Sequence, residues 1–334
     1  MFSIKSTLFI GLFGLSQVFA QDFNPKYANE FLNMGVGAAA LGMGSAVVAD
    51  VDGLNAGVWN PAGLSQQAQA TEIGLMHASY FGGLAAFDHL GVSRRVAPQT
   101  VVALNLIRLG VDNIYNTTQL IDNQGNIDYS QLQTFNSADY ALIGSIGKPT
   151  RVQHLSVGVS AKVLYRHIGN FAKAYGFGFD AGLQYRPSKY WSAGLSMRDA
   201  TSTFSAWTYT LSPEMQATLL QTNNELPQNG IEQMLPRIVL GIAGKLPLEN
   251  EKYELGGQLN AEITTDGPRN TLLSGSVFSL DPRAGLYLNY DHKLTLRTGV
   301  SQFQYFLDFD QNKKLGLQPH LGAGVVLQNW TIDY

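Results

Sequence analysis

Residues 155–166 read Leu-Ser-Val-Gly-Val-Ser-Ala-Lys-Val-Leu-Tyr-Arg, so that nearly every second side chain is apolar and only Leu164 falls on the other parity. Successive side chains of a β-strand point to opposite faces, and a period of two therefore predicts a strand with one apolar and one polar face. Similar alternation returns in later segments, namely residues 175–185, 191–198, 237–246, 253–263 and 294–300. Much of the chain is therefore predicted to be β-sheet.

The length of these segments and the residues on each face indicate where such a sheet resides. Most segments offer the about 9 to 11 residues that a tilted strand needs to cross a bilayer, whereas ordinary strands average about 5 to 6. The polar face is mostly Gly, Ser, Gln and Asn, and only 14% of the whole chain is charged. A soluble β-sandwich or propeller is the alternative, but its polar face would meet water and carry more charge. We predict an all-β, antiparallel, transmembrane outer-membrane β-barrel.

The N-terminus carries an export signal. Lys5 precedes an apolar stretch at residues 8–15 and the small-residue pattern Val18-Phe19-Ala20, which predicts a signal peptide over residues 1–20 and a mature chain starting at Gln21. No later stretch approaches the about 18 apolar residues of a transmembrane helix, and the chain has no cysteine. The predicted location is the outer membrane, with its lipid as a partner. No basic patch interleaved with aromatic residues suggests nucleic acid.

The linkers between predicted strands alternate in length. The strands are expected at residues 71–80, 86–96, 100–108, 138–147, 154–166, 174–186, 189–198, 236–246, 252–264, 283–291, 294–306 and from 319 onward. The linkers after even-numbered strands are short, whereas the long ones, such as residues 109–137 and 199–235, follow odd-numbered strands. Short turns on one side and long extracellular loops on the other are typical of outer-membrane barrels.

The apolar face changes twice near the end of the chain. The first change lies between Val300 and Phe303, and the second lies near Gln328-Asn329. A bulge at the second position would give a barrel of twelve strands. A turn there would leave a short last strand and an odd count, as in a barrel of the 14-stranded type that lacks its closing hairpin.

Residues 21–70 precede the first strand and lack a period of two, so we expect them to form an N-terminal plug in the barrel of residues 71–334. Residues 27–44 read YANEFLNMGVGAAALGMG, and Asn60-Pro61-Ala62-Gly63-Leu64 follows. With Arg283-Ala284-Gly285-Leu286, residues 294–299 and the ending Ile332-Asp333-Tyr334, these motifs resemble the PorV/PorQ family of Bacteroidota. That family is itself similar to the FadL-like transporters, and its members continue past the Asp-Tyr pair with a final hairpin.

The resemblance implies a FadL-like barrel of the 14-stranded type and a function in the type IX protein secretion system. In that system the chain would be a non-enzymatic component that binds or shuttles exported cargo, with the translocon and secreted proteins as partners. The alternative function is that of a FadL-like transporter for hydrophobic small molecules. A barrel enzyme would require a Ser or Asp beside one of the six histidines at the outer rim, and we expect no enzyme, cofactor or metal site.

Two groups of candidate site residues emerge. Ten charges share the predicted inner face: Lys162, Arg166, Asp180, Arg186, Arg198, Arg237, Lys245, Glu254, Glu262 and Arg297. They could attract anions into a pore, but ion pairs that fill a packed interior are the favoured alternative. The second group lies on the loop of residues 200–235, where Phe204, Trp207, Tyr209 and Met215 could contact a partner or a fatty ligand. These four could equally cap the mouth of the barrel.

Overall fold

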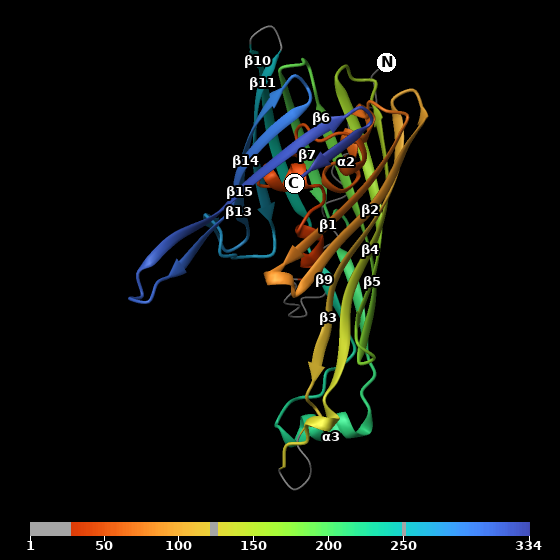
Figure 1. Ribbon diagram of the computed structural model, residues 1–334, viewed down its shortest axis with the longest axis vertical. Coiled ribbons are helices and arrows are strands. Elements are labelled where there is room, and N and C mark those ends of the chain that lie inside the picture. The colour runs from red at the N-terminus through yellow and green to blue at the C-terminus, as the bar shows by residue number, and fades with distance from the viewer. Residues whose placement is uncertain (1–27, 121–125, 249–251) are drawn as a thin grey trace, which may run out of the picture.

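The computed structural model describes residues 28–120, 126–248 and 252–334 (Figure 1). The predicted signal peptide and residues 21–27 of the predicted plug lie outside the described residues. Among the described residues, no helix is long and apolar enough to cross a membrane. The helices are η1 (Glu30–Asn33), α1 (Ala38–Gly42), α2 (Gly53–Trp59), η2 (Pro61–Gln66), η3 (Phe81–Gly83), η4 (Tyr129–Gln131) and α3 (Pro213–Gln221).

In the described residues, sixteen strands form one antiparallel sheet. They are β1 (Thr71–Tyr80), β2 (Ala85–Ala97), β3 (Thr100–Asn116), β4 (Gln133–Pro149), β5 (Leu155–Ile168), β6 (Ala172–Tyr185), β7 (Trp191–Arg198), β8 (Thr203–Tyr209), β9 (Gly230–Met234), β10 (Arg237–Leu248), β11 (Tyr253–Thr264), β12 (Leu273–Ser274), β13 (Ser279–Tyr290), β14 (Leu294–Leu307), β15 (Lys313–Leu327) and β16 (Trp330–Asp333). Neighbours pair in the order β1 to β7, then β10, β11, β13, β14, β15 and β16. Figure 1 shows this wall curling around the helices of the N-terminal segment.

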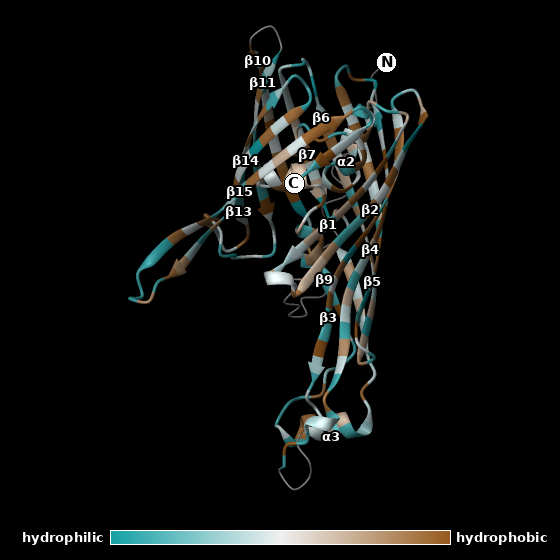
Figure 2. Cartoon of the chain, in the orientation of Figure 1, coloured by the Kyte–Doolittle hydropathy of each residue, from teal (hydrophilic) through white to brown (hydrophobic). Residues whose placement is uncertain are grey.

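Burial in this sheet is inverted relative to a water-soluble protein. On β5, Val159 and Val163 are more than half exposed, whereas Ser160 and Lys162 are each 3% exposed. Hydrophobic and hydrophilic residues alternate along many of the strands in Figure 2. An exposed apolar face around a buried polar one is the arrangement of a barrel in lipid, so the predicted fold class is confirmed.

Aromatic residues border the exposed apolar band at both ends. Towards the long loops, the ring of Tyr165 lies 6.1 Å from that of Tyr140 and 5.2 Å from that of Tyr175. Towards the short turns, Tyr185 contacts Trp191 at 5.9 Å. Aromatic girdles mark the two membrane interfaces of such barrels, and we take these two rows as the limits of the membrane-spanning band.

The predicted loop of residues 200–235 is partly strand, and this prediction was wrong. β8 pairs with β6 beyond the end of β7, and β9 pairs with β8. The chain leaves β7 through Asp199 and Ser202, whose φ angles are 54° and 63°, so the strand is interrupted rather than ended. The alternation in residues 203–209 is too short to distinguish from a loop that is rich in Ser and Thr.

The structure explains both changes of face near the end of the chain. The register of β14 against β15 shifts between Ser301 and Gln304, which is a bulge. A turn follows Leu327, because Leu327 pairs with Trp330 and Gln328 has a φ of 54°. The turn alternative is therefore correct: the last strand, β16, is short, and the continuous path of the described sheet has thirteen strands, the odd count that a turn predicts. Its edges are β1 and β16.

The N-terminal segment, residues 28–70, lies against the inner face of the wall. α1 contacts β14 and β15, α2 contacts β1 to β4, and η2 contacts β3 to β6. Where the wall and the N-terminal segment are closest, the wall residues that face the segment are glycines. If any of these glycines carried a Cβ atom, that atom would lie only 2.0–2.4 Å from an atom of the segment. This glycine belt comprises Gly147, Gly158, Gly182, Gly194, Gly285 and Gly299. The belt lets the backbone of the plug approach the backbone of the wall directly.

Candidate functional site

One sector of the inner wall is apolar, although most of the inner face is polar. It is formed where β1 to β5 lie side by side, and its large side chains Phe87, Ile107 and Leu164 are at most 1% exposed. We call this sector the apolar seat; it comprises Met76, Tyr80, Phe87, Ile107, Leu109, Ile143 and Leu164. These residues occupy the same alternate positions as the polar inner residues of the other strands, so the seat is a local change of composition and not of register.

Residues 29–36 of the N-terminal segment cover the apolar seat, and we call them the cover segment. Phe31, Leu32, Met34 and Val36 belong to the same apolar cluster as the seat. The indole Nε1 of Trp59 donates to the carbonyl of Val36 at 2.8 Å. Just beyond the segment, the amide of Gly37 donates to Sδ of Met76 at 3.1 Å. The cover segment thus contacts both the plug and the wall.

Polar contacts hold the cover segment from strands farther along the sheet. Glu30 lies 2.7 Å from Nη2 of Arg237 and 3.6 Å from Nη1 of Arg269. Arg198 donates to the carbonyl of Leu32 at 2.8 Å, and Ser205 donates to the Asn29 side chain at 2.9 Å. One side of the cover segment is therefore apolar and the other is fixed by charges.

Asn60 anchors the plug to the inner face of β6. Its side-chain amide donates to the carbonyls of Val48 and Leu183 at 2.8 and 3.0 Å, and its Oδ1 accepts from the amide of Ala62 at 3.3 Å. One side chain therefore joins the plug to β6 and caps the start of η2. This geometry gives a physical reason for the Asn-Pro-Ala-Gly-Leu motif.

All ten predicted inner-face charges have a partner inside the barrel. Distances are 2.7 Å for Lys162–Asp180, 2.8 Å for Arg166–Asp139, 3.4 Å for Arg186–Asp50, 2.7 Å for Lys245–Asp50, 3.3 Å for Arg237–Glu262, 2.7 Å for Arg297–Asp333, 2.8 Å from Arg198 to the Leu32 carbonyl and 2.8 Å from Glu254 to the Tyr287 hydroxyl. Sequence analysis missed partners outside the clear alternation, such as Asp50 and Asp199. These charges link wall strands to one another and to the plug.

The four predicted loop residues do not form one exposed cluster. Trp207 is 8% exposed and lies under the guanidinium of Arg166, whose Cζ is 4.8 Å from the ring centroid. Phe204 lies on the other face of β8 and contacts Phe177 at 5.9 Å, whereas Tyr209 stacks on Trp207 at 6.1 Å. Met215 is on α3 and only partly buried. The three aromatic residues are part of the wall because β8 extends it.

Two histidines have the kind of partner that a barrel enzyme would need, but in separate places. His77 and Asp88 are 2.7 Å apart on the outer side of β1 and β2. His320 lies 2.8 Å from Ser301 on the inner side of β15 and β14. A nucleophile, a base and an acid are therefore not assembled by these two pairs.

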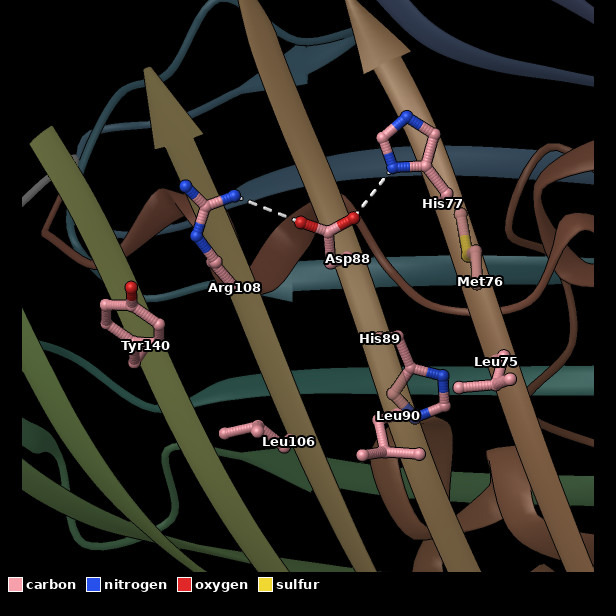
Figure 3. Close-up of a pocket in the computed structure, with 9 residues that line it drawn as sticks. All are labelled: Leu75, Met76, His77, Asp88, His89, Leu90, Leu106, Arg108 and Tyr140. Atoms are coloured by element: carbon pink, nitrogen blue, oxygen red, sulfur yellow. Dashed lines mark hydrogen bonds and ion pairs between the residues drawn. The ribbon is translucent and has the colours of Figure 1, made fainter. Parts of the chain in front are cut away.

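A shallow groove of about 450 Å³ surrounds the His77–Asp88 pair. Figure 3 shows Asp88 between His77 and Arg108, with Leu75, Leu90 and Leu106 in the neighbouring row. Arg108 lies 3.1 Å from Asp88. Most of the residues that line the groove lie on the outer side of the sheet, and the groove shares only Met76 with the apolar seat.

No protein-family model matches the chain, and no curated protein matches it in sequence. Among solved structures, the toluene transporter TbuX of Ralstonia pickettii is similar at 15% identity over 90% of this chain and 92% of its own, with a TM-score of 0.51. The toluene transporter TodX of Pseudomonas putida is 14% identical over 88% of this chain and 89% of its own, with a TM-score of 0.50. The chain therefore has the fold of a FadL-like outer-membrane β-barrel. The narrower resemblance to the PorV/PorQ family stays a prediction.

Proposed function

We propose that this outer-membrane barrel is a non-enzymatic transporter that passes small hydrophobic molecules and binds them on the apolar seat. The observation that carries the proposal is the seat itself, an apolar sector in a polar interior. Transfer of apolar surface out of water contributes about 25 cal/mol per Å², which gives a hydrophobic solute a reason to occupy this sector. TbuX and TodX, which share the fold, are toluene transporters.

Transport requires the cover segment to leave the seat. Its apolar residues occupy the surface that a solute would use, so a bound solute can replace their contacts with the seat at a small net cost in free energy. Glu30 and Asn29 are held by side chains of the wall rather than by a continuous strand. The cover segment can thus exchange between bound and released states while the glycine belt keeps the rest of the plug in place.

A reversible cross-link tests this proposal. The chain has no native cysteine, and Ser205 Oγ lies 2.9 Å from the Asn29 side chain. In the variant carrying both Asn29→Cys and Ser205→Cys, oxidation should abolish uptake of a radiolabelled aromatic hydrocarbon into cells that lack their own hydrophobic-solute transporter. Reduction should restore uptake, and each single variant should be insensitive to oxidation. Uptake that continues with the cover segment locked would contradict the proposal.

We also propose, as a second candidate, the secretion function that the sequence resemblance implies. One observation favours it: β3 to β6, with α3 at the tip, extend well beyond the rest of the wall on the side of the long loops (Figure 1). The plug fills the interior, so exported cargo would be held on this projecting wall and not inside the barrel.

Gene deletion separates the two candidates. Loss of secretion of cargo that bears C-terminal sorting domains, with co-purification of the tagged chain and a translocon, would support the secretion function. Unchanged secretion with lost hydrocarbon uptake would support transport alone.

A further inference from the structure

The outer part of the β14–β15 hairpin leaves the barrel wall, and we call residues 302–317 the finger. Beyond Val300, β14 pairs with β15 alone, because its pairing with β13 ends there. Figure 1 shows the finger continuing the tilt of β14 and β15 sideways from the wall, well short of the level of α3. A two-stranded ribbon of this kind has little stability of its own in water, so a surface that supports it is expected.

The bulge in β14 determines which side chains share a face of the finger. β15 has no bulge, so Leu315 and Leu317 lie on the same side as Leu321 and Ala323, which belong to the lipid-facing band. On β14, Tyr305 pairs with Leu315 only because the register shifts between Ser301 and Gln304. Without this shift, Phe303, Tyr305 and Leu307 would turn to the opposite side.

The resulting face of the finger is apolar and exposed. Leu307, Leu315 and Leu317 are 61%, 48% and 53% exposed, and Phe309 at the tip is fully exposed. Nζ of Lys313 lies 4.2 Å from the ring centroid of Tyr305 on the same face. The opposite face contains Gln304, Lys314 and Gly316, with Phe306 as its one large apolar residue.

The free backbone edge of the finger is partly occupied. The side chain of Asn270 accepts from the amide of Tyr305 at 3.1 Å and donates to its carbonyl at 2.7 Å, as a neighbouring strand would. Within the part of the chain that the structure describes, the edge of the finger is thus partly paired, whereas the leucines of its apolar face remain about half exposed or more.

We propose that the apolar face of the finger lies on the outer leaflet of the membrane, at the boundary between headgroups and acyl chains. Three observations support lipid as the occupant. The face continues the lipid-facing band of β15 without interruption. The bulge turns Phe303 and Tyr305 of β14 to that side, and the Lys–Tyr pair is of the kind that anchors proteins at membrane interfaces. The finger would widen the footprint of the barrel in the membrane, a role independent of transport or secretion.

Single-cysteine labelling tests the proposal, because the chain has no cysteine of its own. Leu315→Cys and the matched control Gln304→Cys, on opposite faces of the finger, are labelled with an environment-sensitive fluorophore and reconstituted into phosphatidylcholine–phosphatidylglycerol vesicles. Leu321→Cys serves as the lipid reference and Ala217→Cys on α3 as the water reference. We expect Leu315→Cys to show blue-shifted emission and quenching by headgroup-proximal spin-labelled lipid, with Gln304→Cys closer to the water reference.

A second variant tests the role of the bulge. Deletion of Gln302 removes the extra residue, and a label at Tyr305→Cys should then move from lipid to water, while heat-dependent gel migration reports whether the barrel is folded. Equal access of iodide to the labels at positions 315 and 304, with no quenching by lipid, would overturn the proposal. Shielding of Leu315→Cys that appears only after addition of outer-membrane proteins would also overturn it, in favour of a protein partner.

Discussion

At the scale of single residues, the glycine belt is the most constrained feature of the molecule. A Cβ atom at Gly158 would lie 2.2 Å from the carbonyl carbon of Pro61 and 2.4 Å from the amide nitrogen of Ala62. Both neighbours are backbone atoms, so no side chain can rotate away to make room. Gly144, only one strand away, has no atom within 4 Å of such a Cβ.

Gly158→Ala should therefore push the plug away from β5 and lower the stability of the folded barrel, whereas Gly144→Ala should leave the stability unchanged. Overpacking of this kind costs about 1–3 kcal/mol. Thermal unfolding of the two variants in the same detergent would measure the difference. Equal melting temperatures would show that the plug does not rest on the wall at this point.

The side chains of Asp266 and Arg269 form an ion pair in the loop after β11, with a 2.5 Å separation between Oδ2 and Nη2. Burial raises the pKa of the Asp266 carboxyl, but the hydrogen bond and charge of Arg269 outweigh burial and hold this pKa below its ordinary value. Because the pKa is lowered in the folded state, the ion pair stabilises the loop above the ordinary pKa of about 3.9. That stabilisation is lost as the pH falls through the lowered pKa.

Pepsin cleavage beside Leu272 should therefore be slow at about pH 5 and accelerate below about pH 4 in the native chain. In Asp266→Asn the cleavage should already be fast at the higher pH, after correction for the pH profile of pepsin on an unfolded peptide. A native chain whose corrected rate does not depend on pH would exclude the ion pair as a support of the loop.

Sequence analysis assigned the ten charges to the inner face from parity alone, because successive side chains of a strand point to opposite faces. It could not identify their partners. Asp199 lies in a strand interruption and Asp50 lies in the plug, and neither position follows the period of two that the prediction used.

At the scale of elements, the interruption between β7 and β8 is built around a buried lysine. Nζ of Lys162 lies 2.7 Å from Asp180 and 2.5 Å from Asp199, and all three side chains are at most 9% exposed. Thr203 donates to Asp199 at 2.5 Å, and the amide of Asp199 donates to Asp180 at 2.7 Å. This buried ion-pair cluster thus fixes the place where β7 ends and β8 takes over the pairing with β6.

Lys162→Met should destabilise the barrel strongly, because it leaves two carboxylates buried without their cation. Removal of one partner of a buried ion pair costs about 3–5 kcal/mol. Lys293→Met, which breaks the exposed pair with Asp291, is the matched control and should leave stability unchanged. Urea unfolding followed by tryptophan fluorescence distinguishes the two, and similar midpoints for both would contradict a structural role for the buried cluster.

All twelve predicted strands exist, because long alternating segments leave little choice of secondary structure. β8 and β9 were not predicted because they are short, at seven and five residues. The outer end of β3 was also missed, because a bulge between Val111 and Ile114 changes the face of this strand. Bulges obscure a period of two even where the strand continues.

At the scale of the whole molecule, the turns and loops define an orientation. The short turn at Ser188 and the helix α3 lie at opposite ends of the wall, with the aromatic girdles between them. In intact cells, a membrane-impermeant maleimide should label Ala217→Cys and fail to label Ser188→Cys until the outer membrane is permeabilised. Labelling of Ser188→Cys alone would mean that the barrel is inserted the other way round.

The apolar seat could not be predicted from the sequence as a site. Its members are apolar residues on the otherwise polar parity of five strands, such as Leu164, the one exception in the opening segment of β5. They become a surface only when the register brings Ile107 opposite Ala141 and Ala141 opposite Leu164. In residues 155–166, the only sign of the apolar seat was Leu164, the apolar residue on the polar parity.

The close fit between the glycine belt and the plug also constrains the order of assembly. Pro61 and Met43 contact wall strands that lie far apart in the sequence, β5 and β13, so the plug gains all its contacts only when these strands have come together. We therefore expect the sheet to close around the N-terminal segment. The segment thus acts as a template for the curvature of the wall, and mutations that loosen it should slow insertion into the membrane before they affect the finished barrel.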